Sequence, residues 1–124
     1  MAHFLVTPTA RNHIRKIISD TRDKWGAAQA FQYRRQLEEG LQHIAAHHHT
    51  FHSPLREALA DGTAFSLHRV QHHYIAFLAH PRKGVIIVGV FHERMDLPTR
   101  LRELQNLAQH EIDALKREIG RLSI

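Results

Sequence analysis

Cysteine is absent from this chain of 124 residues, and the absence removes several classes of function. Disulfide bridges, thiol nucleophiles and metal sites built on thiolates are all excluded. Because no covalent cross-link is available, the fold must be held by packing, and a chain of this length can bury a hydrophobic core of its own. We therefore predict a single domain over residues 1–124, without a cofactor.

Long apolar runs are missing as well. No stretch approaches the roughly 20 apolar residues of a transmembrane helix. The N-terminal segment MAHFLVTPTARN lacks the charged start and the apolar core of a secretion signal. We therefore expect no membrane association and a cytoplasmic location.

Acidic residues are in the minority. Lys and Arg number 17 against 12 Asp and Glu, so the net charge is +5, and 13 histidines add to it as the pH falls. A basic chain can meet a polyanion or an acidic protein, and charge alone does not choose between them. His43 and His47 stand four apart, as in a helical zinc pair, but no carboxylate or cysteine completes an obvious ligand set. We predict no metal site there.

The spacing of apolar residues predicts an α+β domain. Thr7 and Pro8 are typical of a helix start, Gly26 of a helix stop, and a second helix follows at once. Gly40 is a weak point of about 1 kcal/mol within that second helix. The run Val85–Phe91 is apolar on both of its faces, which is typical of a central strand covered on each side. The expected elements are a strand over residues 3–7, helices over 8–25 and 27–48, strands over 64–70, 73–80 and 84–92, and a helix from about 97 to the end.

Four segments together resemble the RelE/ParE superfamily of toxin–antitoxin systems, and the ParE-type toxins in particular. They are LVTPTARNHIRKI, WGAAQAFQYRRQLEEGLQHIA, the strand HHYIAF and the strand end VIIVGVFHERMD. The resemblance spans roughly residues 3–101. It implies an N-terminal strand and a helical hairpin packed on an antiparallel sheet. The C-terminal amphipathic helix extends past the usual family end, so we divide the chain into a toxin-like core, residues 1–98, and a helical extension, residues 99–124.

The resemblance implies a toxin that aids plasmid stabilisation. A cognate antitoxin would neutralise it, and DNA gyrase would be its target, inhibited by binding and held in a cleaved complex. Two alternatives stay open: a RelE-like mRNA interferase, which cuts ribosome-bound mRNA, and a non-toxic binding module of the same fold.

If their strands are neighbours, two pairs offer a base, an acid and cations for RNA cleavage: His68 with Arg69, and His92 with Arg94. RelE-type enzymes usually carry a tyrosine near the C-terminus, whereas Tyr74 is the last tyrosine here. We therefore predict no catalytic residue. Arg69 and Lys83 are the candidate contacts to phosphate or nucleic acid.

The strand-end cluster HERMD has two interpretations. His92, Arg94 and Asp96 either contact the target or act as a latch for the last strand, with Asp96 accepting from Arg94 or capping the next helix.

Two further surfaces are expected to bind partners. Trp25, Tyr33 and Leu37 on the helical hairpin are the expected antitoxin contacts. The stripe of the last helix is expected to pack on the sheet near Leu101 and Leu104. From Ile112 onward it is expected to be free for a partner, either the antitoxin or a second copy of the chain. Its members are Leu101, Leu104, Ala108, Ile112, Leu115, Ile119 and Leu122.

Overall fold

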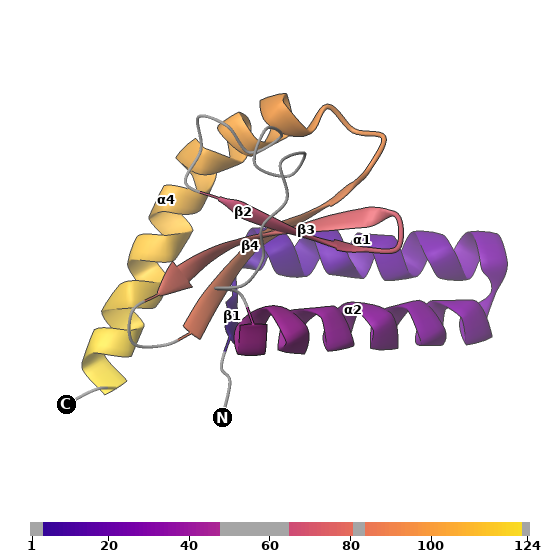
Figure 1. Ribbon diagram of the computed structural model, residues 1–124, viewed down its shortest axis with the longest axis horizontal. Helices are drawn as coiled ribbons and strands as arrows, with labels where there is room; N and C mark the ends of the chain where they lie inside the picture. Colours follow the sequence, from indigo (N-terminus) through magenta and orange to yellow (C-terminus); the bar gives the residue numbers. More distant parts are fainter. Residues whose placement is uncertain (1–3, 48–64, 81–83, 123–124) are drawn as a thin grey trace.

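The computed structural model describes residues 4–47, 65–80 and 84–122. The predicted α+β class is confirmed, with an N-terminal strand, a helical hairpin, a sheet and a C-terminal helix (Figure 1). In chain order the elements are β1 (Phe4–Val6), α1 (Pro8–Trp25), α2 (Ala27–His47), β2 (Ser66–Val70), β3 (His73–His80), β4 (Gly84–His92) and α4 (Leu97–Leu122).

The sheet has the strand order β1-β4-β3-β2. The last three strands in the chain pair antiparallel, as predicted, and β1 adds a parallel pair alongside β4, which makes the sheet mixed. Strand β4 therefore lies in the interior of the sheet, as its apolar run predicts. The turn from β2 to β3 places Gln71 at φ 52°, so a left-handed position is filled by a residue other than glycine, and no typical turn residue marks it.

Helix α1 begins and ends where its sequence predicts. The Thr7 hydroxyl accepts a hydrogen bond from the Ala10 N–H at 3.2 Å, and Pro8 occupies the first helical position. At the other end Gly26 has φ 94°, and its N–H donates to the Arg22 carbonyl at 2.8 Å. Because only glycine adopts this backbone without strain, the chain turns sharply and α2 begins one residue later.

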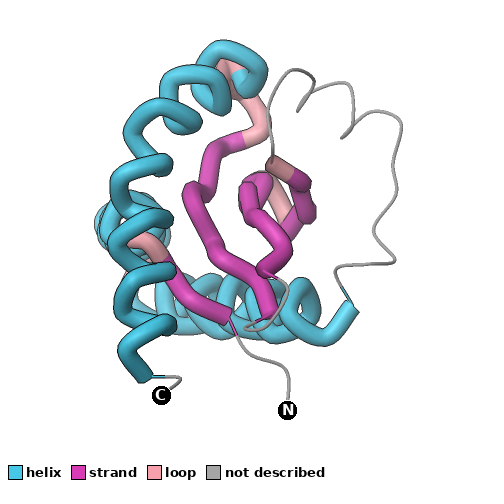
Figure 2. Tube along the Cα trace, turned by 90° about the vertical axis from the view of Figure 1, so that its left-hand side faces the viewer, coloured by secondary structure: helices cyan, strands magenta, loops and turns pink. Residues whose placement is uncertain are grey.

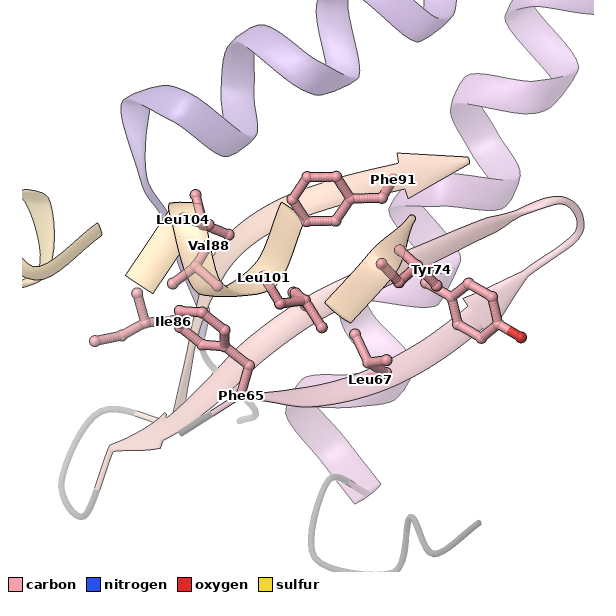
Figure 3. Close-up of a cluster of buried hydrophobic side chains, with 10 residues drawn as sticks. Phe65, Leu67, Tyr74, Ile86, Val88, Phe91, Leu101 and Leu104 are labelled. Carbon is pink, nitrogen blue, oxygen red and sulfur yellow. The ribbon is translucent and has the colours of Figure 1, made fainter. Parts of the chain in front are cut away.

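Three layers make up the domain, with the sheet in the middle. The hairpin α1–α2 covers one face and α4 the other, which the two views show together (Figures 1 and 2). Buried residues on the hairpin side are Ala10, Leu41, Ile44, Ala45, Ile75, Phe77, Val85, Ile87 and Val90. On the α4 side they are Phe65, Leu67, Tyr74, Ala76, Ile86, Val88, Phe91, Leu97, Leu101 and Leu104 (Figure 3).

A β-bulge in β4 decides which of its side chains face which layer. Ala76 pairs with Gly89 but Phe77 pairs with Ile87, so Val88 is the extra residue. The bulge reverses the alternation that follows it. As a result Phe91 joins the α4 side and Val90 joins the hairpin side.

Gly40, expected to be a weak point of α2, lies at a close approach between α2 and the sheet. A Cβ built on it would lie 2.5 Å from Val70 Cγ2 and 3.5 Å from Ile75 Cδ1. The position therefore has a packing reason to be glycine that helix propensity does not reveal.

Helix α4 packs on the sheet through its first turns, as predicted. Leu101 is fully buried and Leu104 is 5% exposed (Figure 3). The side chains of the distal stripe, from Ala108 to Leu122 by way of Ile112, Leu115 and Ile119, lie outside the described residues. Although α4 has 26 residues, neither it nor another described helix is apolar enough to cross a membrane.

A second contact attaches α4 to the start of α1. Glu111 accepts from the Thr9 hydroxyl at 2.6 Å and from the Thr9 N–H at 3.4 Å. The first turn of α1 carries no acidic residue of its own. Glu111 therefore supplies the negative charge that a helix N-terminus favours, and it does so from the far end of the chain.

Candidate functional site

The strand end HERMD opens onto a cleft of about 670 Å³, which we call the strand-end cleft. It lies between the half of the helical hairpin that contains the Gly26 corner, the start of β3 and the end of β4. Its walls include Lys24 and Trp25 of α1, Tyr33 of α2, His73 of β3, His92 of β4 and Arg100 of α4.

Glu93 fixes the end of the last strand. Its carboxylate pairs with the Arg69 guanidinium at 2.5 Å and accepts from His72 Nδ1 at 2.9 Å. Its N–H donates to the His72 carbonyl at 2.8 Å, so the β3–β4 ladder extends past His92. The hydrogen bond from His72, aided by the Arg69 charge, holds the pKa of Glu93 below its usual range. This charge-assisted contact joins Glu93 to β2 and to the turn between β2 and β3, whereas a latch on His92, Arg94 and Asp96 stays a prediction.

Arg94 and Asp96 lie in the exposed turn that follows. The Arg94 N–H donates to His92 Nδ1 at 3.1 Å, which leaves the proton of the neutral ring on Nε2. Asp96 accepts from the Thr99 hydroxyl at 2.8 Å, and its carbonyl accepts from the Arg100 N–H at 3.0 Å. Asp96 therefore stands just before α4, and its carboxylate contacts a side chain in the first turn of that helix. Whether His92, Arg94 and Asp96 contact a target stays a prediction.

Tyr33 ties α2 to the sheet inside the cleft. Its hydroxyl is hydrogen-bonded to His73 Nδ1. Burial raises the pKa of Tyr33 to about 12. Burial, with the nearby His92 and His72, lowers the pKa of His73 to about 4. At neutral pH the hydroxyl therefore keeps its proton and the imidazole is uncharged, so the tautomer of His73 decides which of the two groups donates.

The three residues expected to contact the antitoxin lie at two different places. Trp25 is 68% exposed and, like Tyr33, lines the strand-end cleft. Leu37 is 1% exposed and lies in the floor of a second depression, of about 660 Å³, which we call the hairpin groove. The hairpin groove is formed by α1, α2 and β1, and is lined by Phe4, Val6, Ile14, Ile18, Leu37 and Leu41 with Arg11, Arg15, Arg22 and Arg34.

The two pairs considered as a catalytic set come from strands that are not neighbours in the sheet. β2 and β4 are separated by β3 in the sheet, so they are not the neighbouring strands that the catalytic interpretation requires. His68 on β2 lies against His43 of α2, with ring centroids 5.4 Å apart. Arg69 is held by Glu93 and by the Gln71 carbonyl at 2.8 Å. Lys83, the other expected phosphate contact, lies outside the described residues.

Comparison with known proteins decides the family. The sequence model of the ParE toxin of type II toxin–antitoxin systems, parDE, matches residues 4–97. The chain belongs to the ParE toxin family. It is 36% identical over 101 residues to Toxin ParE of Escherichia coli, an alignment that covers 82% of this chain and 94% of that protein. It is 29% identical over 106 residues to Toxin ParE1 of Mycobacterium tuberculosis, covering 81% of this chain and 98% of that one.

The ParE match ends at the residue where α4 begins. The first turns of α4 nevertheless complete the core on one face of the sheet.

Sequence reasoning missed two residues at this end of the sheet. Glu93 is the ion-pairing member of the HERMD cluster, although only His92, Arg94 and Asp96 were expected to act there. His13 was not singled out, yet its Nδ1 accepts from the Val90 N–H at 3.2 Å, and burial lowers its pKa. The pairing of Glu93 with His72 follows from the antiparallel register of β3 and β4, which hairpin counting can find. The His13 contact depends on the bulge and has no sequence signal.

Proposed function

We propose that this ParE-family toxin inhibits DNA gyrase by binding and stabilises a cleaved gyrase–DNA complex, without breaking a bond itself. The observation that carries the proposal is the family match, which spans the hairpin and the whole sheet. The strand-end cluster, exposed beside a cleft, offers a surface for such binding.

The positions and partners of His68, Arg69 and His92 support a binding role and not a catalytic one. A ribonuclease needs a base, an acid and a free cation around one phosphate. Here Arg69 is engaged by Glu93, and His68 and His92 lie on strands that β3 separates. The set of His68, Arg69, His92 and Arg94 therefore does not present that arrangement.

Purified protein added to gyrase, plasmid DNA and ATP tests the proposal. We expect cleaved DNA to accumulate, together with a loss of supercoiling. Untouched gyrase with cutting of ribosome-bound mRNA would establish the RelE-like alternative. No effect in either assay would favour a non-toxic binding module.

We infer that the hairpin groove receives the cognate antitoxin. Its apolar floor suits one face of an amphipathic segment, and four arginines stand against Glu38 as the one carboxylate among its described lining residues. Glu38 is itself paired with Arg34 at 3.1 Å. An acidic segment that folds on binding would complement both features.

Two neighbouring arginines of α2 provide a matched test. Arg34 lines the groove and Arg35 does not, and each pairs with a glutamate four residues on. Arg34→Glu should weaken antitoxin binding severalfold and reduce its dependence on salt, while Arg35→Glu should have a much smaller effect. If calorimetry shows that both variants lose the same affinity for the antitoxin, the groove is not part of the interface.

A further inference from the structure

We propose that the strand-end cleft binds a single strand of DNA, so that the toxin contacts nucleic acid directly. This inference rests on the proposed function in one respect: gyrase inhibition would place the protein beside cleaved DNA, so we choose DNA over RNA as the ligand. The chemistry of the cleft carries the rest: cations on its walls, one exposed indole at its edge, and ring N–H donors between them.

The fixed charges of the cleft favour an anion. Lys16, Lys24 and Arg100 line it, and Asp20 is the one carboxylate among its described lining residues. Lys16 and Asp20 pair at 3.2 Å, which leaves Lys24 of α1 and Arg100 of α4 as the other lysine and arginine in its lining. Arg100 is 3.8 Å from Glu103, an exposed and weak pairing. Two cations that come from separate elements can track successive phosphates.

Trp25 supplies a surface on which a base can stack. It is 68% exposed, and Lys24 Nζ lies 5.7 Å from the centroid of its ring. Stacking on an exposed aromatic ring is the principal sequence-independent contact of proteins that bind single strands. Inside a duplex both faces of a base are covered by its neighbours, so this contact selects an unpaired strand.

Two histidines of the cleft present a donor to a ligand. His92 Nδ1 accepts from the Arg94 N–H, and His13 Nδ1 accepts from the Val90 N–H. In each neutral ring the proton is therefore on Nε2. Phosphate and base-edge oxygens are acceptors, so they match these donors, whereas a metal cation would not.

The single tryptophan of the chain makes the test direct, because all indole fluorescence comes from the edge of the cleft. The intact chain is titrated with an unlabelled oligothymidylate about ten nucleotides long. We expect saturable quenching of Trp25, with an affinity that falls as salt is raised.

Three variants then test the assignment by anisotropy of a labelled copy of the same oligonucleotide. Trp25→Ala should weaken binding by about tenfold or more, as expected for loss of one stacked base. Phe31→Ala removes an aromatic residue that is 65% exposed but does not line the cleft, and it should bind like wild type. Lys24→Gln should lower the slope of log Kd against log salt by about 0.7, the value for one phosphate contact on a single strand.

Several results would overturn the proposal. Equal binding by Trp25→Ala and wild type would remove the stacking contact. If a duplex or polyglutamate binds as tightly as the single strand, the cleft attracts any polyanion and does not select a single strand. Tighter binding of oligouridylate would move the ligand class to RNA.

The gyrase assay separates this inference from the proposed function. A wild-type protein that inhibits gyrase but does not bind the oligonucleotide refutes direct DNA contact alone. A protein that binds the oligonucleotide through Trp25 but leaves gyrase untouched refutes the gyrase proposal alone.

Discussion

Gly40→Ala is expected to destabilise this protein, although helix propensity predicts the opposite. In the interior of a helix, alanine is favoured over glycine by about 1 kcal/mol. Here the new methyl group would lie 2.5 Å from Val70 Cγ2, far inside van der Waals contact. Val70 is β-branched and cannot rotate freely away from the contact. Overpacking of this kind costs about 1–3 kcal/mol, so we expect a net loss of about 1 kcal/mol.

A double-mutant cycle isolates the clash. Val70→Ala removes the opposing methyl group, and in that background Gly40→Ala should stabilise the protein by its propensity, up to about 1 kcal/mol. The coupling between the two sites should therefore reach about 2 kcal/mol. Urea unfolding followed by circular dichroism measures all four proteins.

Propensity in the same helix is calibrated at an exposed position. Gln32 is exposed on α2, and the difference between Gln32→Ala and Gln32→Gly gives the local preference for alanine without a packing change. If Gly40→Ala stabilises the wild-type protein by that same difference, the close approach of α2 to β2 has no energetic consequence and the reasoning fails.

Three other perturbations test the structure. His73 should lower the free energy of unfolding by about 1–2 kcal/mol as the pH drops from 6.5 towards 4, a figure reduced for solvent screening of the partly exposed ring. In that pH range the unfolded chain protonates His73, whereas the folded ring stays neutral because its pKa is lowered. His73→Gln should reduce this loss in thermal melts across pH, and His110→Gln, on the exposed surface of α4, should not. Glu111→Gln should cost about 1 kcal/mol through its contact with Thr9, more than Glu103→Gln does, and equal urea midpoints would contradict this. Arg94→Ala should reduce gyrase inhibition with little change in Tm, since the residue is exposed; unchanged inhibition would exclude it from the target surface.

Elements with local causes could be predicted from the sequence. Thr7, Pro8 and Gly26 determine the ends of α1 through contacts within a few residues. The two apolar faces of β4 predicted a strand covered on both sides, and the two buried clusters confirm it. The packing of Leu101 and Leu104 followed from helical spacing in the same way.

Contacts between distant segments could not be predicted. The parallel pairing of β1 with β4 joins segments about 80 residues apart, and no local pattern specifies it. Glu111 reaches Thr9 across 102 positions, and the fit of Gly40 against Val70 depends on how α2 lies on the sheet. Each is a property of tertiary packing, which can override local propensity.

Helix α1 is the shared wall of the two depressions, and this limits how an antitoxin can neutralise the toxin. Arg11, Arg15 and Arg22 border the hairpin groove, whereas Lys16 and Lys24 border the strand-end cleft on the other side of the helix. A segment that filled only the groove would leave the cleft open to a DNA strand.

Full neutralisation would then require the antitoxin to extend over the tip of the hairpin. Two large exposed side chains, Trp25 and Phe31, stand at that tip, and such residues commonly mark a surface that a partner covers. We therefore expect the fluorescence of Trp25 to shift to the blue when the antitoxin binds, and oligothymidylate to lose its quenching effect on the complex. If the emission of Trp25 is unchanged in the complex and the oligonucleotide still quenches it, the antitoxin acts from the groove alone and leaves the cleft accessible.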